Sequence, residues 1–481
     1  MRRNFHDLSH EHKTSTNMGY LVPINTMEVL PGDTFVGSTS MLARVAPLAN
    51  PVMHNVQLRV HHFFVPNRII WDKWQDWITG EDAASEMPVV AATDDTETPL
   101  LDYMGVPPVI GTEVSALPVR AYNLIYNEFY RDQDLAAKRD LDNLTVAQIA
   151  WEKDYFTTCR PQPQQGEPID IEFTAGEVPI KGIGWSAGGQ VLDPTYTLNE
   201  TGQVQRTTIG QHVSSGSNAT AQIFLEADVQ NGEYPNVRAD MSQATGGISV
   251  DSLRRSIGLQ RLAEARMRYG SRYVDYLRFL GINPSDGRLD RPEFLGGGVQ
   301  TINFSEVLAT AEGNNSNVGD MYGHGIAAVR SKRYRKMFEE HGWVITLLSA
   351  RPKTVYMNNV PRQYLRRDHV EYWQKELEIM PWQEVKQNEV FANGDPNTTF
   401  GYAPRYNEYR HHMSYVSGSF RTTEKDWHMA REFATPPTLN ESFIRCTPTD
   451  RIYQDTSMPE LLINARNDIR AMRLVRKEAQ L

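Results

Sequence analysis

The feature that most constrains this chain is a two-residue alternation in "HNVQLRVHHFFVPN", residues 54–67. Successive side chains of a strand point to opposite faces of a sheet, so the alternation predicts a half-buried strand. One face would hold Val56, Leu58, Val60, His62 and Phe64, and the other Gln57, Arg59, His61 and Phe63. Adjacent histidines on such a strand point apart and cannot easily share a metal ion.

Further strands are expected on both sides of this one. Residues 20–65 hold short apolar runs separated by turn residues such as Pro31-Gly32-Asp33. The segments "VQTINFSEVLAT", "GWVITLLSAR" and "KTVYMNN", residues 299–310, 342–351 and 353–359, also read as buried or half-buried strands. No fixed-period repeat is visible, and helices do not alternate with strands one for one. The pattern therefore favours a β-sandwich with long connections over a doubly wound parallel sheet.

Helical spacing is confined to a few excursions between the strands. Apolar residues recur at helical intervals in 68–79 and 117–131. A longer helix is predicted over 251–270, where Asp251 or Ser252 is a plausible N-cap and Gly270 ends the apolar stripe. Residues 166–246 are dense in Gly, Ser, Thr, Asn and Gln, which indicates a variable surface insertion within one domain made of 1–165 and 247–481.

Composition narrows the function classes. The 481 residues are 40% hydrophobic and carry a net charge of −10, so any contact with nucleic acid must be local. Only two cysteines occur, Cys159 and Cys446, and they form no CxxC pair, a usage that suits a reducing cytoplasm. The N-terminus lacks the apolar stretch of a secretory signal, and no segment has the length of a membrane span, so no membrane insertion is expected.

The stretch "DGRLDRPEFLGGGVQ", residues 286–300, contains a glycine triplet that raises the question of a phosphate-binding loop. Its triplet, Gly296, Gly297 and Gly298, lacks the Lys-Ser/Thr of a P-loop and runs into a strand rather than opening a helix. The alternative is that the glycines allow a flexible backbone, or one at positive φ where the Cβ of another residue would not fit. We interpret the triplet as part of the architecture.

No enzyme signature emerges elsewhere. The 13 histidines form no HExxH or cupin-type pattern, and GxSxG is absent. We therefore predict no catalytic residues, no metal and no cofactor. Two basic ends remain, with Arg2 and Arg3 at the start and Arg466, Arg470, Arg473, Arg476 and Lys477 near the finish. Such tails either lie against nucleic-acid phosphates or are frayed, solvated termini.

Several stretches, in order, carry a family resemblance. They are "MGYLVPINTMEVLPGDTF", "NPVMHNVQLRVHHFFVPNRIIW", "RAYNLIYNEFYR", "WEKDYFTTCRP", "RYGSRYVDYL", "SDGRLDRPEFLGGGVQTINFSEVL", "FGYAPRYNEYR" and "FRTTEKDWHMAREF". Together they resemble the major capsid protein of the Microviridae, small tailless phages with circular single-stranded DNA, and most of all the gokushovirus branch. The resemblance spans nearly the whole chain.

The resemblance implies a mainly β fold, an eight-stranded antiparallel jelly roll with long inter-strand loops that contain helices. It implies a structural protein of the virion, sixty copies of which assemble in the bacterial cytoplasm into a T=1 icosahedral shell around the genome. The partners would be other copies of the chain and the circular single-stranded DNA. A small basic DNA-packaging protein, a minor pilot protein and a host-surface receptor are further candidates, and the 166–246 insertion would supply threefold protrusions.

Within that family, Arg288, Arg291 and Glu293 would anchor a long loop that the three glycines let fold back closely. The terminal basic residues are compositional candidates for DNA contact. Two rival functions stay open at this point. One is a jelly-roll protein that binds or processes carbohydrate with aromatic loops, and the other is a metal-dependent, cupin-like enzyme.

Overall fold

The computed structural model describes residues 3–82, 84–93, 99–167, 169, 250–270, 272–310 and 318–476, with five short strands between 180 and 239. The chain divides into two compact units, one of residues 1–165 and 264–481 and one of residues 166–263. The second unit contains β8 (Ile180–Lys181), β9 (Gly184–Trp185), β10 (Thr197–Asn199), β11 (Thr208–Gln211) and β12 (Arg238–Ala239). Apart from these strands and residues 166, 167 and 169, the predicted insertion lies outside the described residues.

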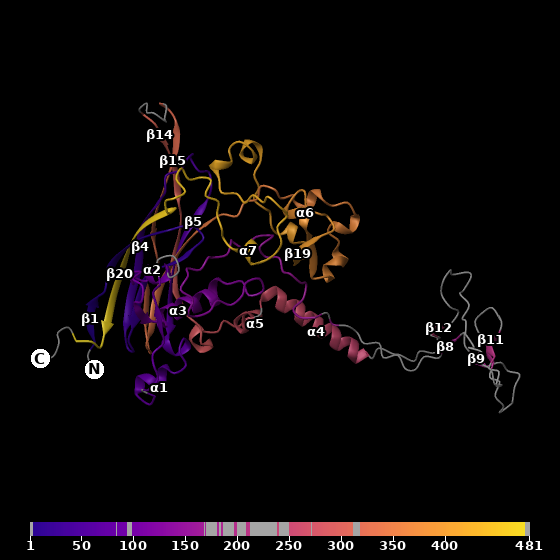
Figure 1. The fold of residues 1–481 in the computed structure, drawn as a ribbon, viewed down its shortest axis with the longest axis horizontal. Helices are drawn as coiled ribbons and strands as arrows, with labels where there is room; N and C mark the ends of the chain where they lie inside the picture. Colours follow the sequence, from indigo (N-terminus) through magenta and orange to yellow (C-terminus); the bar gives the residue numbers. More distant parts are fainter. Residues whose placement is uncertain are drawn as a thin grey trace, which may run out of the picture. The chain divides into compact units, whose positions relative to one another are not determined.

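Two antiparallel sheets form the centre of the larger unit (Figure 1). Sheet 1 consists of β1 (Asn4–Asp7), β2 (His10–Thr16), β4 (Thr34–Val45), β14 (Asn303–Leu308), β15 (Met321–Arg330), β16 (Tyr334–Met337) and β20 (Leu461–Arg473). Sheet 2 consists of β3 (Leu21–Val29), β5 (Val56–Pro66), β13 (Glu293–Thr301) and β17 (Gly342–Pro352). Two smaller antiparallel sheets pair β6 (Val89–Ala91) with β7 (Glu113–Ser115) and β18 (Trp382–Lys386) with β19 (Thr399–Pro404).

The strand order is that of a jelly roll. One sheet runs β2-β20-β4-β15 and the other β3-β17-β5-β13, so the chain changes sheets between most successive strands. This arrangement of two antiparallel four-stranded halves is the double Greek key of viral jelly rolls. The predicted fold class is confirmed, and β1, β14 and β16 extend sheet 1 beyond the eight core strands.

Between the sheets lies the apolar core. Met41, Ala43, Ile463 and Ala465 of sheet 1 face Val22, Ile24, Leu58, Val60 and Leu348 of sheet 2. The alternation predicted for β5 is confirmed, since His62 lies buried in this layer against Thr346 while His61 points away to the hydroxyl of Tyr130. The two histidines therefore occupy opposite faces.

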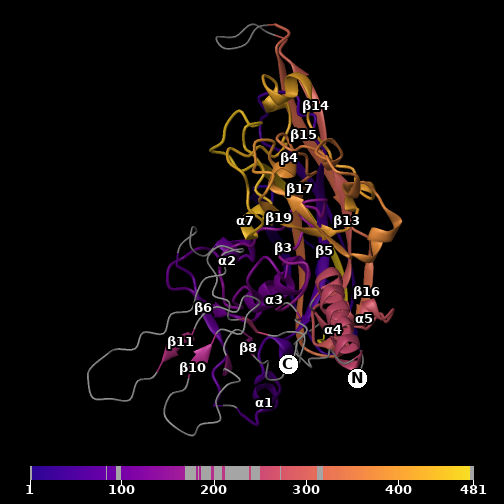
Figure 2. The same ribbon diagram turned by 90° about the vertical axis from the view of Figure 1, so that its right-hand side faces the viewer.

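Helices cover the outward face of sheet 2. The excursion between β5 and β13 contains α1 (Trp74–Thr79), α2 (Pro99–Tyr103) and α3 (Leu117–Ile125), followed by a π-helical turn, Tyr126–Tyr130. In Figure 2, α2 and α3 lie beside β3 and β5. Tyr122 of α3 is fully buried, and its hydroxyl donates to the carbonyl of Leu21 and accepts from the amide of Ala147.

The remaining helices are α4 (Val250–Tyr269), α5 (Tyr273–Phe279), α6 (Gln387–Val390) and α7 (Glu441–Ile444). The helix predicted over 251–270 is confirmed as α4. The helix predicted over 68–79 is shorter, because Asn67–Ile69 form a 3-10 turn before α1 begins at Trp74. None of the helices in the described ranges combines the length and apolar character needed to cross a bilayer.

The glycine triplet does not lie in a loop, which corrects the sequence interpretation. Gly296, Gly297 and Gly298 belong to β13, where a bulge follows Phe294 and Gly296 has φ +134°. A Cβ on Gly297 would lie 2.3 Å from the carbonyl oxygen of Val60, and one on Gly298 would lie 2.8 Å from Cα of Ser331. The triplet therefore permits close backbone packing inside the sandwich.

The three charged residues before the triplet have separate partners. Arg291 is buried, lies 3.4 Å from Asp286 and stacks its guanidinium over the ring of Phe129. Glu293, on β13 itself, pairs with Lys336 of β16 at 2.6 Å. Arg288 is exposed in a 3-10 turn. Ion pairs therefore support an anchoring role for Arg291 and Glu293. What these residues anchor is the start of strand β13, and not the long loop that was expected.

Two other sequence interpretations are wrong. Residues 353–359 form only isolated bridges through Tyr356, because that segment leaves the sheet directly after β17.

The basic C-terminal segment is not a tail, since β20 pairs with β4 on one side and with β1 and β2 on the other. Removing residues 466–473 would delete the middle of sheet 1.

Candidate nucleic-acid interface

The outward face of sheet 1 carries a local concentration of positive charge. On β20 the residues Leu461, Ile463, Ala465, Ile469 and Ala471 point into the core. The intervening positions Arg466 and Arg470 therefore point outward. Figure 1 shows β20 between β1 and β4, so its outward side chains lie in the middle of the sheet rather than at an edge.

Strand register brings further arginines to the same face. Arg470 lies opposite Val36 of β4, which lies opposite Arg335 of β16. Four residues back along β20, Arg466 lies opposite Ser40, which lies opposite Arg330 of β15. These cross-strand rows place arginines from β15, β16 and β20 on a single surface, although those of β20 are more than 130 positions from the others in the sequence.

A groove of about 400 Å³ crosses this surface. We call it the basic groove; its lining residues are Phe5, Asp7, Ser9, Thr34, Val36, Arg333, Arg335, Arg466, Asp468, Arg470 and Met472. The ring of Phe5 among them is exposed. Four guanidinium groups and an aromatic ring are suited to phosphates and to the face of an unpaired base.

Most of the charge in the groove is available to a partner. Arg466 pairs with Asp468 at 2.8 Å, and this hydrogen bond raises the pKa of Arg466. Asp7 has a lowered pKa because it accepts hydrogen bonds from Ser9, with a smaller contribution from Arg470. Among the residues that the structure describes, the guanidinium groups of Arg333, Arg335 and Arg470 have no hydrogen bond or ion pair to the protein.

The predicted DNA-contact residues separate into groups. Arg466 and Arg470 line the groove, and Arg3 donates to Thr34 Oγ1 beside it. Arg473 is engaged elsewhere, because it pairs with the fully buried Asp33 at 2.9 Å, donates to the carbonyl of Glu28 and stacks over Phe35. Arg476 is exposed after the end of β20, and Arg2 and Lys477 lie outside the described residues.

Sequence reasoning missed Arg330, Arg333 and Arg335. A signal for β20 was present, because apolar or small residues alternate with polar ones through "LLINARNDIRAM", residues 461–472. That alternation predicts which arginines share a face of β20. It cannot predict that β16 pairs with β4 across the sheet.

Comparison with known proteins identifies the family. The profile described as "Capsid protein (F protein)" matches residues 1–478. The chain is 31% identical to capsid protein VP1 of Chlamydia phage 1, over 98% of this chain and 94% of the relative. It is 30% identical to VP1 of Bdellovibrio phage phiMH2K and 27% identical to VP1 of Spiroplasma virus 4, each over 90% of this chain and 86% of the relative.

The chain belongs to this phage capsid protein family. It is thus a major capsid protein of a small phage and a component of the virion, and the resemblance to the Microviridae is confirmed. Self-assembly into a capsid follows from the family. Part of the exposed surface of this capsid protein must therefore contact other copies of the chain.

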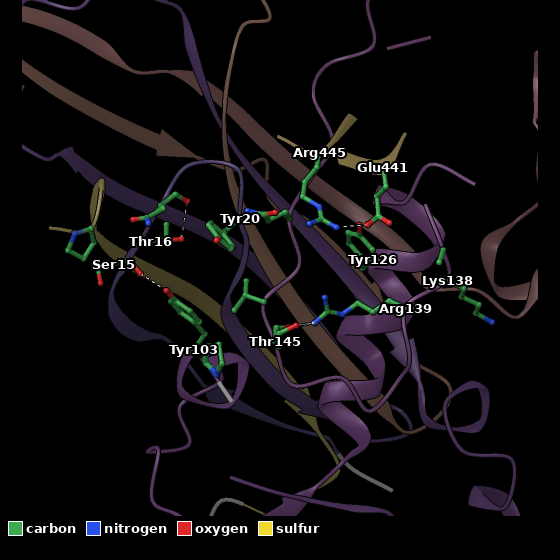
Figure 3. A pocket seen from close by; sticks show the side chains of 16 residues that line it. Ser15, Thr16, Tyr20, Tyr103, Tyr126, Lys138, Arg139, Thr145, Glu441 and Arg445 are labelled. Carbon is green, nitrogen blue, oxygen red and sulfur yellow. Dashed lines mark hydrogen bonds and ion pairs between the residues drawn. The ribbon is translucent and has the colours of Figure 1, made fainter. Parts of the chain in front are cut away.

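A larger cavity of about 760 Å³ lies elsewhere on the capsid protein (Figure 3). Tyr20, Tyr103 and Tyr126 line it, and the hydroxyl of Tyr103 donates to the carbonyl of Ser15. Its arginines are held by the protein: Arg445 pairs with Glu441 at 2.6 Å, and Arg139 donates to Asn123, Asn143 and Thr145. Because those guanidinium groups are occupied, the basic groove is the better candidate for an anionic partner.

Proposed function

We propose that sixty copies of this chain form a T=1 icosahedral shell around a circular single-stranded DNA genome, and that the basic groove contacts the DNA backbone. The observation that carries the DNA contact is the set of arginines without protein partners on the outward face of sheet 1, in a chain whose net charge is −10. A local basic surface on an acidic protein is suited to a phosphate partner.

The groove can bind DNA without reading its sequence. Arg333, Arg335 and Arg470 would contact phosphates, and Phe5 would stack on an unpaired base. Contacts of this kind are independent of base identity. They suit a shell protein that must contact many different stretches of one genome.

The wider proposal keeps the other partners inferred from the resemblance. These are a small basic packaging protein, a minor pilot protein and a host-surface receptor, with assembly in the bacterial cytoplasm. We also propose that residues 166–246 form outer protrusions and that the chain has a structural rather than catalytic role. Family membership favours this function over carbohydrate binding or metal-dependent catalysis.

The DNA contact can be tested with single-stranded oligonucleotides and purified subunits at several salt concentrations. Arg335→Glu and Arg470→Glu should each weaken binding. Each should also reduce the slope of log affinity against log salt by roughly 0.7, the value for one lost phosphate contact on a single strand. Arg288→Glu is the matched control, because Arg288 is an exposed arginine outside the groove. Equal salt slopes for all three variants would remove the groove from the interface.

A further inference from the structure

A loop between β17 and β18 exposes large apolar side chains without burying any residue. Residues 362–380, which we call the aromatic loop, contain three 3-10 turns, and no position in it is buried. The exposed fractions are 73% for Tyr364, 43% for Val370, 51% for Tyr372, 52% for Trp373, 82% for Ile379 and 41% for Met380. Single exposed apolar residues are ordinary, but a contiguous group of this kind marks an interaction surface.

Two of the exposed side chains, those of Tyr372 and Trp373, are held in place by the loop and its neighbours. The indole of Trp373 donates to Glu378 at 2.8 Å. Arg366 pairs with Glu408 at 2.8 Å and lies over the rings of Tyr372 and Tyr409, at 5.2 and 4.6 Å from their centroids. A surface fixed before binding loses less conformational entropy when a partner arrives.

A second exposed apolar surface lies at residues 264–282, on the end of α4 and on α5. We call it the α5 surface. Its exposed fractions are 49% for Tyr269, 64% for Tyr273, 42% for Tyr276, 45% for Phe279, 52% for Leu280 and 50% for Ile282. The rings of Tyr269 and Phe279 contact each other with centroids 4.5 Å apart and planes tilted by 35°. Tyrosine and phenylalanine are enriched at the centres of protein interfaces.

The two surfaces carry opposite charge. The aromatic loop has four acidic residues, Asp368, Glu371, Glu376 and Glu378. Two of its four basic residues, Arg362 and Arg366, are paired with Glu389 and Glu408 outside the loop, which leaves Arg367 and Lys375. On the α5 surface Arg272 is likewise paired with Glu128, which leaves Arg266, Arg268 and Arg278 against Glu264 and Asp275. Each surface would repel a copy of itself and attract the other.

We propose that the aromatic loop of one capsid protein packs on the α5 surface of a second copy. A contact between two different patches is head-to-tail, and repetition of it around a rotation axis closes into a ring. Trp373 and Ile379 would supply the apolar anchors, and the charge difference would set the orientation. This interface is independent of the proposed DNA contact.

Truncating one anchor tests the loop. Ile379→Ser should lower the fraction of protein assembled into particles by about tenfold, as expected for an interface anchor, without changing the melting temperature of the unassembled subunit. The matched control is Ile110→Ser, because Ile110 is 79% exposed in a different loop. Sedimentation of both variants without DNA gives the assembled fraction. Wild-type assembly of Ile379→Ser, or an equal loss in the control, would overturn the proposal.

Cross-linking tests the pairing itself. Both native cysteines, Cys159 and Cys446, are buried, so introduced thiols can be addressed selectively. A chain with Lys375→Cys, which leaves the apolar anchors in place, and Tyr273→Cys, assembled into particles, should give a ladder of linked copies with a short bis-maleimide. The pair Ile110→Cys and Tyr273→Cys should give none. Particles that form from the first variant but yield no ladder would show that the loop contacts something other than the α5 surface.

Discussion

The outward faces of the two sheets differ in what covers them. On sheet 2, Phe63, Val65, Ile345 and Leu347 point outward and are buried beneath the excursion that contains α3. On sheet 1, the corresponding outward positions include Arg466 and Arg470, which line an open groove. Both faces follow the same two-residue alternation, so the strand pattern alone does not distinguish a covered face from an open one.

The difference means that the two outward faces of the sandwich have separate roles: the covered face stabilises the fold, and the open face remains available to a partner. Apolar burial on sheet 2 contributes free energy to the fold of the subunit. Charged residues on sheet 1 contribute little to that free energy and remain available to a partner. Substitutions on the two faces should therefore have separable effects on folding and on binding.

The largest effect is expected beneath α3. Tyr122→Ala should lower the free energy of unfolding by about 4 kcal/mol, because the variant loses a fully buried ring and leaves a cavity. Tyr122→Phe keeps the ring and loses only the two hydrogen bonds, so its loss should be about 1–2 kcal/mol. Urea unfolding of the unassembled subunit measures both. A negligible loss for the alanine variant would mean that the helical excursion is not part of the stable fold.

The next effect concerns β13. Gly297→Val should destabilise the subunit by about 3 kcal/mol, because the new side chain would overlap the carbonyl of Val60 on the neighbouring strand. Gly287→Val is a suitable control, since a Cβ at Gly287 meets nothing within 4 Å. Normal folding and particle formation by Gly297→Val would contradict the close packing of β13 on β5.

A smaller effect should depend on pH. Burial lowers the pKa of His62 to about 4, so the folded chain favours the neutral ring while the unfolded chain titrates near its ordinary value. Stability is therefore complete above about pH 6.5 and falls as the pH drops towards 4. His62→Gln should remove on the order of 2 kcal/mol of that acid-induced loss between pH 7 and 4.

His61, on the covered face of sheet 2, has its pKa lowered to about 4 as well, mainly by burial. Some acid sensitivity should therefore persist in the His62→Gln variant. The exposed His411→Gln is the control for the measurement, which is urea unfolding at several pH values. An unchanged pH slope in His62→Gln would argue against a neutral, buried His62.

The smallest effect is expected on the open face. Arg335→Ser and Arg470→Ser should each change the free energy of unfolding by less than about 0.5 kcal/mol, because neither side chain has a hydrogen bond or ion pair among the described residues. Thermal unfolding of the subunit gives this value. A loss comparable to that of Tyr122→Phe would mean that the basic face stabilises the fold and that the two outward faces are not different in kind.

Sequence reasoning recovered the strands whose alternation is strong and local. It predicted β5 with the correct faces, β17 from a run of apolar residues and α4 from its caps. It missed β20 as a strand and treated Arg466 and Arg470 as part of a tail. The two-residue alternation of β20 was present in the sequence, but its pairing with β4, more than 400 positions earlier, left no local signal that this basic segment lies inside a sheet.

The candidate site was recovered only in part for the same reason. Arg466 and Arg470 were identified by composition, but Arg473 was grouped with them although it forms a buried ion pair with Asp33. Arg333 and Arg335 were not identified, because their proximity to β20 depends on the register of β16 on β4. The glycine triplet was interpreted as architecture rather than as a P-loop, but its place in β13 became clear only from the pairing with β5.

The sequence by itself determined the class of fold, the faces of the strongly alternating strands and the family resemblance, because these depend on side-chain order along a short segment or along the whole chain. Tertiary structure alone decided which arginines share a surface and which outward face is covered. Strand pairing joins residues hundreds of positions apart, and the charge and burial of a side chain depend on those neighbours rather than on the ones beside it in sequence.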